Sequence, residues 1–487
     1  MSNVGRSWNL AAASLSLGLG GCLMSCAMTL AAAPPPAPPP PPATAPAPAP
    51  APAPAPVPGP GSFTDAAGLW SNFSNSAGEP TGPFFAALGT NARTCATCHA
   101  PNDAWTATPK SLERRFQATA GTDPIFASVD ATNCPTLPTA TPLERASASS
   151  LLLTKGLIRI SLTPPPGAQF AITAVANPYD CTAVAPVSVY RRIPTTANLT
   201  FLSTVMWDGR ESPAGVSIPA DLAHQAADAL TTHAQAKALP PTVVLQAIAG
   251  FETAQFMAQS VDALAGPLDA AGASGGPALL AKQSFTPTAN LPVVSTATNS
   301  DLPPLPVFAV FSSWESLTGG DPQSRARASI GRGERIFNSR PILLTGIAGL
   351  NDQIGPNGVP LSQLHGTCGT CHNTPNAGSH STAVLFNTGV SDAALRSPDL
   401  PLLTLINRTT GASVQTSDPG LALTTGKWAD VNKFKVPALR GLAGRAPYFH
   451  NGAAPDVSAV VDFYDRRFAM QLTSQEHADL VAFLAAL

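Results

Sequence analysis

The stretches RTCATCHAPN, residues 93–102, and GTCGTCHNTP, residues 366–375, each place two cysteines and a histidine within five positions. The chain has 487 residues but only 8 cysteines and 8 histidines, so these two stretches contain half of its cysteines. Two copies at the same spacing hardly arise by chance in such a composition. We therefore expect the chemistry of the protein at these two points.

The pattern C-x-x-C-H is typical of covalent haem attachment. Two thiols three residues apart on a turn can each add to one vinyl group of the porphyrin, and the adjacent imidazole can ligate the iron. A zinc knuckle would need a fourth ligand close by, and a thioredoxin-type redox pair has no use for the histidine. The sequence thus predicts two c-type haems, one on each of two residue sets: Cys95, Cys98 and His99, and Cys368, Cys371 and His372.

Residues 1–33 have the pattern of an export signal, with Arg6 as the only charged side chain before an apolar run over residues 10–33. LGGC, ending at Cys22, resembles a bacterial lipobox, and LMSC, ending at Cys26, is a second candidate. An uncleaved anchor is the alternative, because about 20 apolar residues can span a bilayer. Since c-type haem is attached outside the cytoplasm in bacteria, we expect a periplasmic protein or an outer-membrane lipoprotein that faces the periplasm.

Residues 34–61 carry proline at nearly every second position, which favours an extended, semi-rigid spacer. The folded part is therefore expected to begin near Ser62. Only 11% of the residues are charged and the formal net charge is -2. No basic face for nucleic acid is predicted from this composition.

Cys134 and Cys181 lie outside both haem motifs. In an oxidising compartment they can form a disulfide, which would contribute about 4 kcal/mol by restricting the unfolded chain. Two buried free thiols are the alternative.

The coarse secondary structure is mostly helical. Residues 84–92 and 328–338 are expected to form helices that lead into the two haem motifs, and residues 157–162 and 170–180 a small hairpin or sheet. Residues from 272 to 307 include loop-rich stretches that suggest a connection between two halves. TSQE, Thr473 to Glu476, is a capping-box pattern that predicts the start of the last helix.

Three further stretches, in the same order as in the family, resemble the bacterial di-haem cytochrome c peroxidase and MauG superfamily: PTTANLTFLSTVMWDGRE (residues 194–211), KFKVPALRGLAGRAPYFHNG (433–452) and a closing segment that begins VVDFYDRRF (460–468). The resemblance extends from Gly82 to Leu487. It implies a mainly α fold of two cytochrome c-like domains, with a small β-containing insertion in the N-terminal half. The expected boundaries are 62–325 for the N-terminal haem domain and 326–487 for the C-terminal one.

The resemblance also assigns roles near the first haem. Trp207 falls where the family has a tryptophan that relays electrons between the haems, and Arg210 is available to a haem propionate. Gln225 matches a family glutamine, whereas Gln235 stands where family peroxidases have a glutamate that moves protons. Because a glutamine cannot take up and return a proton, His233 is the candidate general acid/base.

At the second haem, Tyr464 lies fourteen residues after His450, where electron-donating members have methionine and MauG has tyrosine. The resemblance makes Tyr464 the candidate sixth iron ligand, with Met470 and His450 as alternatives. Pro447 matches a residue whose carbonyl binds an interdomain calcium ion. Arg445 stands where threonine is expected, which puts calcium as a cofactor in question.

The resemblance predicts an enzyme that reduces hydrogen peroxide, with electrons that pass between two covalent haems. A small cytochrome or cupredoxin is the expected donor. One alternative is MauG-like or oxygenase-like oxidation of an organic or protein substrate, which Tyr464 and the missing glutamate favour. Another is a non-catalytic di-haem electron carrier. A lipid anchor to the membrane and a homodimer are further expectations that these motifs do not settle.

Overall fold

The computed structural model describes residues 61–76, 81–213, 216–285, 306–354 and 361–487. The predicted export signal and the spacer up to residue 60 lie outside these ranges. In the part of the chain that is described, no helix is both long enough and apolar enough to cross a membrane.

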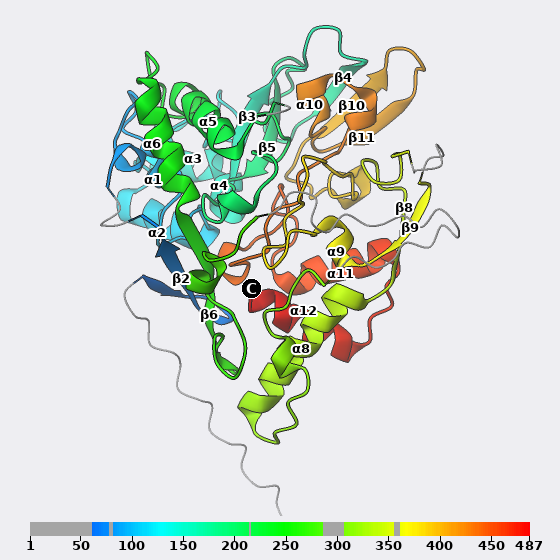
Figure 1. Ribbon diagram of the computed structural model, residues 1–487. Helices are drawn as coiled ribbons and strands as arrows, with labels where there is room; N and C mark the ends of the chain where they lie inside the picture. The colour runs from blue at the N-terminus through cyan, green and yellow to red at the C-terminus, as the bar shows by residue number, and fades with distance from the viewer. Residues whose placement is uncertain (1–60, 77–80, 214–215, 286–305, 355–360) are drawn as a thin grey trace, which may run out of the picture. The chain divides into compact units, whose positions relative to one another are not determined.

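The fold is a mixture of helices and sheets, so the prediction of a mainly α protein is wrong. Helices account for 33% of the structure and strands for 17%. Two of the strand pairings join segments roughly 190 and 230 residues apart, and local sequence patterns do not reveal such pairings. Figure 1 shows helices and strands interspersed through the structure.

One sheet is built from both ends of the N-terminal half. Its strands are β1 (Ser62–Thr64), β2 (Gly68–Ser74), β6 (Gln255–Asp262) and β7 (Gly266–Pro267), all paired antiparallel in that order. Trp70 of β2 and Met257 of β6 are buried in an apolar cluster that also contacts Cys95. This sheet therefore supports the first haem motif.

A second sheet joins the two halves of the chain. β4 (Phe170–Ala176) pairs with β10 (Leu402–Asn407), which pairs with β11 (Ser413–Thr416), as the upper right of Figure 1 shows. The segment 157–162 is β3 (Leu157–Leu162), and it pairs with β5 (Val187–Arg192) instead of β4. The two predicted strands exist, but they lie in different sheets, so the predicted hairpin or small sheet formed by the two is wrong. The domain boundary at residue 325 remains a prediction.

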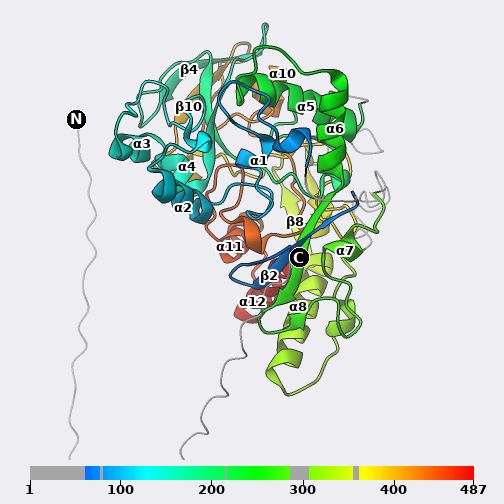
Figure 2. The same cartoon turned by 90° about the vertical axis from the view of Figure 1, so that its left-hand side faces the viewer.

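The longer helices form pairs. α5 (Ile218–Thr232) lies beside α6 (Thr242–Thr253), and α8 (Pro322–Ser339) packs on α12 (Ser474–Ala485) (Figure 2). α8 and the capping box of Thr473 and Glu476 at the start of α12 confirm two predictions. The other helices and strands are α1 (Cys95–Cys98), α2 (Pro109–Thr119), α3 (Pro142–Ala148), α4 (Ser150–Lys155), α7 (Pro277–Leu280), α9 (Cys368–Cys371), α10 (Ala422–Thr425), α11 (Val457–Phe468), β8 (Ile342–Thr345) and β9 (Gln363–Gly366).

The helix predicted over residues 84–92 does not form. Only Pro83–Phe85 make a single 3-10 turn. The chain beyond it passes so close to the end of α5 that only glycine fits at position 89. A Cβ atom there would lie 1.8 Å from the carbonyl oxygen of Ala234. Ala92 has a φ of 61°, which an α-helix does not allow. Tertiary packing thus overrides the apolar pattern of this segment.

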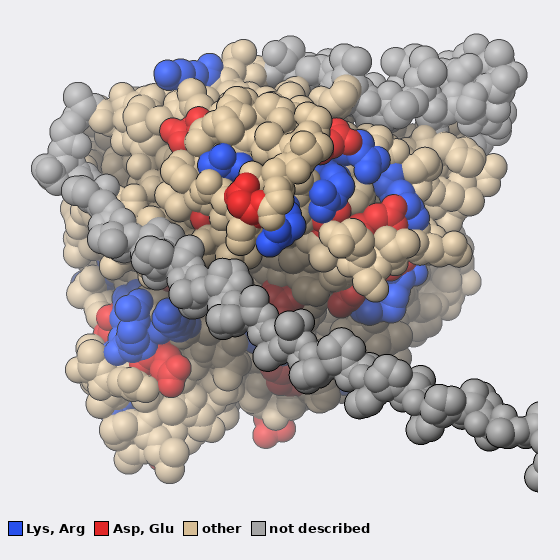
Figure 3. Space-filling view, turned by 90° about the horizontal axis from the view of Figure 1, so that it is seen from below, with Lys and Arg blue, Asp and Glu red and all other residues tan. Residues whose placement is uncertain are grey.

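The surface carries charges of both signs. On the face seen in Figure 3, basic and acidic side chains lie next to one another among uncharged residues. This mixture agrees with the small net charge of the sequence.

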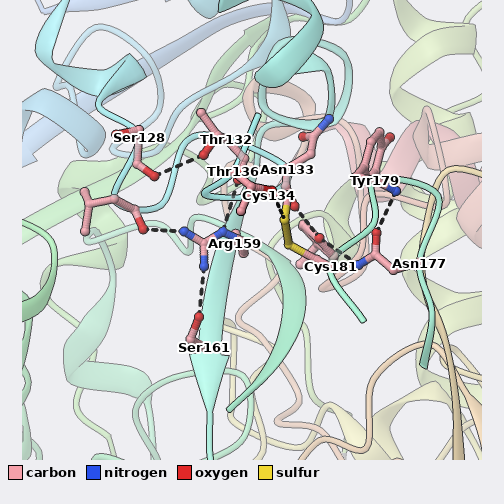
Figure 4. The surroundings of a disulfide bond; sticks show 12 residues. Ser128, Thr132, Asn133, Cys134, Thr136, Arg159, Ser161, Asn177, Tyr179 and Cys181 are labelled. Atoms are coloured by element: carbon pink, nitrogen blue, oxygen red, sulfur yellow. Dashed lines mark hydrogen bonds between the residues drawn. A yellow bond between two sulfur atoms is a disulfide. The ribbon is translucent and has the colours of Figure 1, made fainter. Parts of the chain in front are cut away.

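Cys134 and Cys181 form a disulfide, which confirms the prediction (Figure 4). Arg159 of β3 further fixes the segment between α2 and α3, because its guanidinium donates to the carbonyl oxygens of Val129 and Thr132. The Tyr190 hydroxyl of β5 donates to the carbonyl oxygen of Asn133. The cross-link thus ties the chain between α2 and α3 to the strands that lead toward residue 194.

Candidate functional site

The two haem motifs form the same local structure. Each is a one-turn helix, α1 or α9, that begins after a threonine cap: Thr94 in the first motif and Thr367 in the second. In each, the threonine between the two cysteines, Thr97 or Thr370, completes a capping box. The backbone N–H of the histidine donates to the carbonyl of the first cysteine, at 2.9 Å in the first motif and 3.1 Å in the second. Both motifs thus place two thiols and an imidazole on one turn.

The two imidazoles are oriented in the same way. His99 Nδ1 lies 3.2 Å from the carbonyl oxygen of Trp105, and His372 Nδ1 lies 2.5 Å from that of Gly378. Because a carbonyl only accepts, Nδ1 carries the proton and Nε2 keeps its lone pair for a metal. Burial lowers the pKa of each histidine to about 4. Both are therefore neutral near pH 7, as iron ligation requires.

The thiols of the motifs do not suit redox catalysis. None of them is in a disulfide. Burial raises the pKa of Cys95, Cys368 and Cys371 to about 12 and that of Cys98 to about 11. A redox-active dithiol needs a lowered pKa. In the described ranges, no group of three or more His, Cys, Asp or Glu side chains is arranged to bind a metal ion directly. Haem attachment remains the interpretation that fits these residues.

A cavity of about 210 Å³ lies against the second motif. Cys368, Cys371 and His372 line it, and most of the remaining wall is apolar, including Phe337, Leu344, Phe386, Val436 and Leu480. Among the described lining residues none is Asp or Glu. The surroundings thus suit the flat apolar body of a porphyrin.

All three candidate sixth ligands line this cavity: Tyr464, Met470 and His450. Burial and the nearby thiol of Cys371 raise the pKa of Tyr464, so the free phenol stays protonated near pH 7. The His450 ring stacks on Phe434 with centroids 3.9 Å apart, and its Nδ1 is buried without a hydrogen-bond partner in the described residues. The structure brings the three alternatives together and leaves the choice among them to experiment.

Three cations line the same cavity: Arg192, Lys435 and Arg445. Burial lowers the pKa of the two arginines to about 10 and that of Lys435 to about 8. Within the described ranges, no carboxylate lies within ion-pair distance of any of them. Buried cations of this kind need anionic partners, and the two carboxylates of a haem would supply them. The cavity therefore fits haem at both its apolar and its charged side.

These cations were missed from the sequence, which had pointed to Arg210. In the structure, Arg210 Nη1 lies 3.0 Å from Asp208, and its Nε lies 3.5 Å from Glu211. An internal repeat could have revealed two of the cations. Arg192 stands two residues before Pro194, as Lys435 does before Pro437.

The same repeat continues to Trp207 and His450, each thirteen residues after its proline and each followed by Asp-Gly or Asn-Gly. The two rings meet edge to face, with centroids 6.3 Å apart, and both line the cavity. Pro194 lines the cavity as well. Its backbone carbonyl lies close enough to the His99 imidazole to raise the pKa of that imidazole, against the larger effect of burial. Trp207 thus lies where the surroundings of the two motifs meet.

A buried ion network fixes the position of Trp207. The Arg191 guanidinium lies 2.5 Å from Asp208, the residue after Trp207, and 2.7 Å from Asp418 in the C-terminal half. Burial opposes the charge on Asp208, but Arg191 and Arg210 outweigh it and lower the pKa of Asp208 to about 2. The Trp207 Nε1–H donates to the carbonyl oxygen of Arg192 at 2.8 Å. The indole is therefore held by the hydrogen bond of its own nitrogen and by the ion pairs of the residue that follows it.

The surroundings of the first motif contain titratable side chains. His233 is the C-cap residue of α5. After burial, electrostatic repulsion from His233 is a further cause of the lowered pKa of His99. Gln225 is half-buried on α5, whereas Gln235 is exposed and has a φ of 56° in the turn that follows. Glu252 of α6 was missed from the sequence. Burial raises its pKa to about 8, and its Oε2 has no hydrogen-bond partner in the described residues.

Calcium at Pro447 stays a prediction, although several carbonyl oxygens close to it in sequence already bind arginine side chains. The Arg445 guanidinium is present there and donates to the carbonyl oxygens of Ala438, Arg440 and Gly441 at 2.9–3.0 Å. Arg192 in turn donates to the carbonyl oxygen of Arg445 at 3.1 Å. Carbonyl oxygens are what a calcium ion would need, and here guanidinium groups bind them.

Comparison with known proteins connects these observations to a family. The chain is 33% identical over 150 residues to cytochrome-c peroxidase IdrP1 of Pseudomonas sp. (strain SCT). It is 34% identical over 144 residues to cytochrome-c peroxidase IdrP2 of Denitromonas iodatirespirans. Over about a quarter of its length the chain is thus similar to curated cytochrome-c peroxidases. This confirms the resemblance noted in the sequence and supports an oxidoreductase with c-type haem.

The relationship covers only part of each protein. Both matches include 27% of this chain, which spans 38% of the length of these relatives. No family model matches the chain. The crystal structure of a MauG-like protein associated with microbial copper homeostasis aligns over 77% of this chain and 88% of its own, with 16% identity and a TM-score of 0.31. That likeness is too weak to carry an argument.

Proposed function

We propose that the protein is a di-haem oxidoreductase that reduces hydrogen peroxide to water with electrons passed between two covalent haems. The observation that carries the proposal is the similar local structure of the two motifs together with Trp207 where their surroundings meet. The relatives named cytochrome-c peroxidase support the same reaction class.

The residues of the chain have separate tasks in this reaction. A bound c-type haem supplies a redox-active iron. His99 and His372 provide Nε2 as ligand, and Arg192, Lys435 and Arg445 neutralise haem carboxylates. His233 accepts a proton from peroxide and returns it to the departing oxygen, so that peroxide, two electrons and two protons yield two water molecules. Trp207 is the path for electrons from the second site to the first.

The proposal is tested with protein made alongside the haem-maturation machinery. A pyridine haemochrome assay should find two covalent haems per chain, and Cys368→Ser with Cys371→Ser should leave one. Partly reduced wild type should consume peroxide with a reduced small cytochrome or cupredoxin as donor. Haem that extracts into acidified organic solvent would refute covalent attachment. Two low-spin irons that react with neither cyanide nor peroxide would refute the enzyme and favour an electron carrier.

A second candidate is the oxidation of an organic or protein substrate. Tyr464 favours it, because this tyrosine lines the cavity with His372 and a phenolate ligand stabilises oxidised iron. In that case peroxide would convert the fully oxidised protein into a long-lived oxidant without any external donor. The periplasmic location, the lipid anchor at Cys22 or Cys26 and the homodimer remain predictions that either function accommodates.

A further inference from the structure

We infer that Asp130 positions His233 as the proton-transfer group beside the first haem motif and that Arg93 fixes Asp130 in turn. The inference deepens the proposed function and rests on it for the identity of the substrate. Its structural basis is independent of the family resemblance, which suggested His233 but gave no sign of Asp130 or Arg93.

The three side chains come from distant segments. His233 Nδ1 lies 2.6 Å from Asp130 Oδ2. Arg93 Nη1 donates to the same oxygen at 2.8 Å, and Arg93 Nη2 lies 2.8 Å from Asp130 Oδ1. Arg93 stands only two residues before Cys95, so the cluster is attached directly to the first motif.

The cluster is rigid on the side away from the imidazole. Arg93 is 2% exposed and Asp130 is 4% exposed. The guanidinium also donates to the carbonyl oxygens of Pro124 and Ile125, and both Arg93 and Asn91 donate to the backbone carbonyl of His233. Burial disfavours the charge on Asp130, but His233 and Arg93 outweigh it and lower the pKa of Asp130. Asp130 is thus held in place as a carboxylate.

An ionised carboxylate only accepts hydrogen bonds, so His233 Nδ1 must carry the proton. The lone pair is then on Nε2, which has no hydrogen-bond partner in the described residues. The His233 side chain remains 26% exposed, so Nε2 is not sealed from solvent or a small substrate. A carboxylate that sets the tautomer of a histidine in this way orients it for proton transfer.

Two other groups on the same helix pair lack one of these properties. Glu252 is buried, and since its pKa is about 8 it is mostly protonated at neutral pH and is a poor base. His224 also pairs with a carboxylate, Glu211, at 2.7 Å, but its side chain is 69% exposed. The His224–Glu211 pair therefore serves as a matched control for the His233–Asp130 pair.

The test uses the haem-loaded full chain and the association of cyanide with ferric protein, because hydrogen cyanide must lose its proton on binding. Asp130→Asn reverses the tautomer and should slow both cyanide association and the reaction with peroxide at least about tenfold. Asp130→Glu should recover much of the rate. His233→Ala should lose it, and added imidazole should restore it. Glu211→Gln should behave as wild type.

Haem content and spin state are recorded for every variant. The inference is overturned if Asp130→Asn at full haem content reacts at the wild-type rate. It is also overturned if His233→Ala converts a low-spin first haem to high spin, because His233 would then be an iron ligand. If Asp130→Asn does not retain haem, the test depends on His233→Ala. Restoration of its rate by added imidazole then supports the inference, and a rate that stays low overturns it. If cyanide association follows the expected pattern but wild type leaves peroxide intact, the inference stands and the proposed function fails.

Discussion

The two haem motifs share a local structure and differ in what surrounds them. In both, a threonine-capped turn presents two thiols and an imidazole whose Nδ1 faces a carbonyl six residues further on. Around the first motif lie ionisable groups, the Asp130–His233 pair and Glu252. Around the second lies a cavity with no described acidic side chain, lined instead by Tyr464, Met470 and three cations.

The difference assigns different chemistry to the same motif. Proton transfer needs a group that can accept and return a proton, and the carboxylate-paired imidazole of His233 is such a group beside the first motif. A site that stores electrons needs control of iron potential by an axial ligand and by charge, and the second motif has both kinds of residue. We therefore expect changes near the first motif to alter proton-dependent steps and changes near the second to alter potential.

The largest effect should come from cutting the connection between the two regions. Trp207→Phe keeps a ring against His450 but removes the indole, which loses an electron more easily than a phenyl ring does. Electron transfer between the haems should slow by on the order of a hundredfold, while both haem spectra stay unchanged. Stopped-flow reduction of the half-reduced protein measures this rate, with Trp428→Phe as control. An unchanged rate would mean that electrons bypass Trp207.

Replacing the candidate ligand of the second motif should change one region alone. Tyr464→Met exchanges a hard oxygen for a thioether, which favours ferrous iron, so the potential of the second haem should rise by on the order of 100 mV. Spectroelectrochemical titration measures both haems separately. Met470→Leu is the control and should leave the potential in place. If instead Met470→Leu shifts it and Tyr464→Met does not, Met470 is the ligand.

The sequence predicted most of what is local in these regions. The haem turns, the helix before the second motif and the capping box of Thr473 depend on residues within a few positions of one another. The disulfide was also predictable, because Cys134 and Cys181 are the described cysteines outside the motifs. Spacing and side-chain type decide such features.

What the sequence did not reveal depends on contacts over long separations. β4 pairs with β10 across more than half of the folded chain, and the apolar pattern of either strand fits many partners. Asp130 meets His233 from a loop about a hundred residues away, and nothing near either residue indicates the other. Arg192 and Lys435 are a different case, since the repeat before Pro194 and Pro437 is a local sequence feature that indicates both residues.

Glu252 allows the buried charge of the first region to be tested through stability. Its folded-state pKa of about 8 is raised above an ordinary value near 4.5, so its contribution is fully present below pH 4.5 and is lost as pH rises through 8. Glu252→Gln removes this loss and should raise the unfolding free energy at pH 8, relative to pH 5, by at least about 1 kcal/mol. Thermal or urea unfolding at both values measures it. Glu113→Gln, on the exposed face of α2, is the control. If the unfolding free energies of Glu252→Gln and wild type depend equally on pH, Glu252 is not buried as an acid.

The smallest effect is expected near Pro447, where the family resemblance predicts a calcium ion. Arg445 already donates to three carbonyl oxygens there, and its charge takes the place that a divalent ion would need. Chelation by EDTA should therefore shift the melting temperature by less than about 1 °C, the size expected for a change well below 1 kcal/mol. Arg445→Thr removes those hydrogen bonds and should lower the melting temperature whether or not EDTA is present. The contrary result is a stoichiometric calcium content by elemental analysis together with a clear loss of stability in EDTA. In that case the guanidinium and the ion would have to bind different carbonyls, and calcium would stabilise this part of the protein.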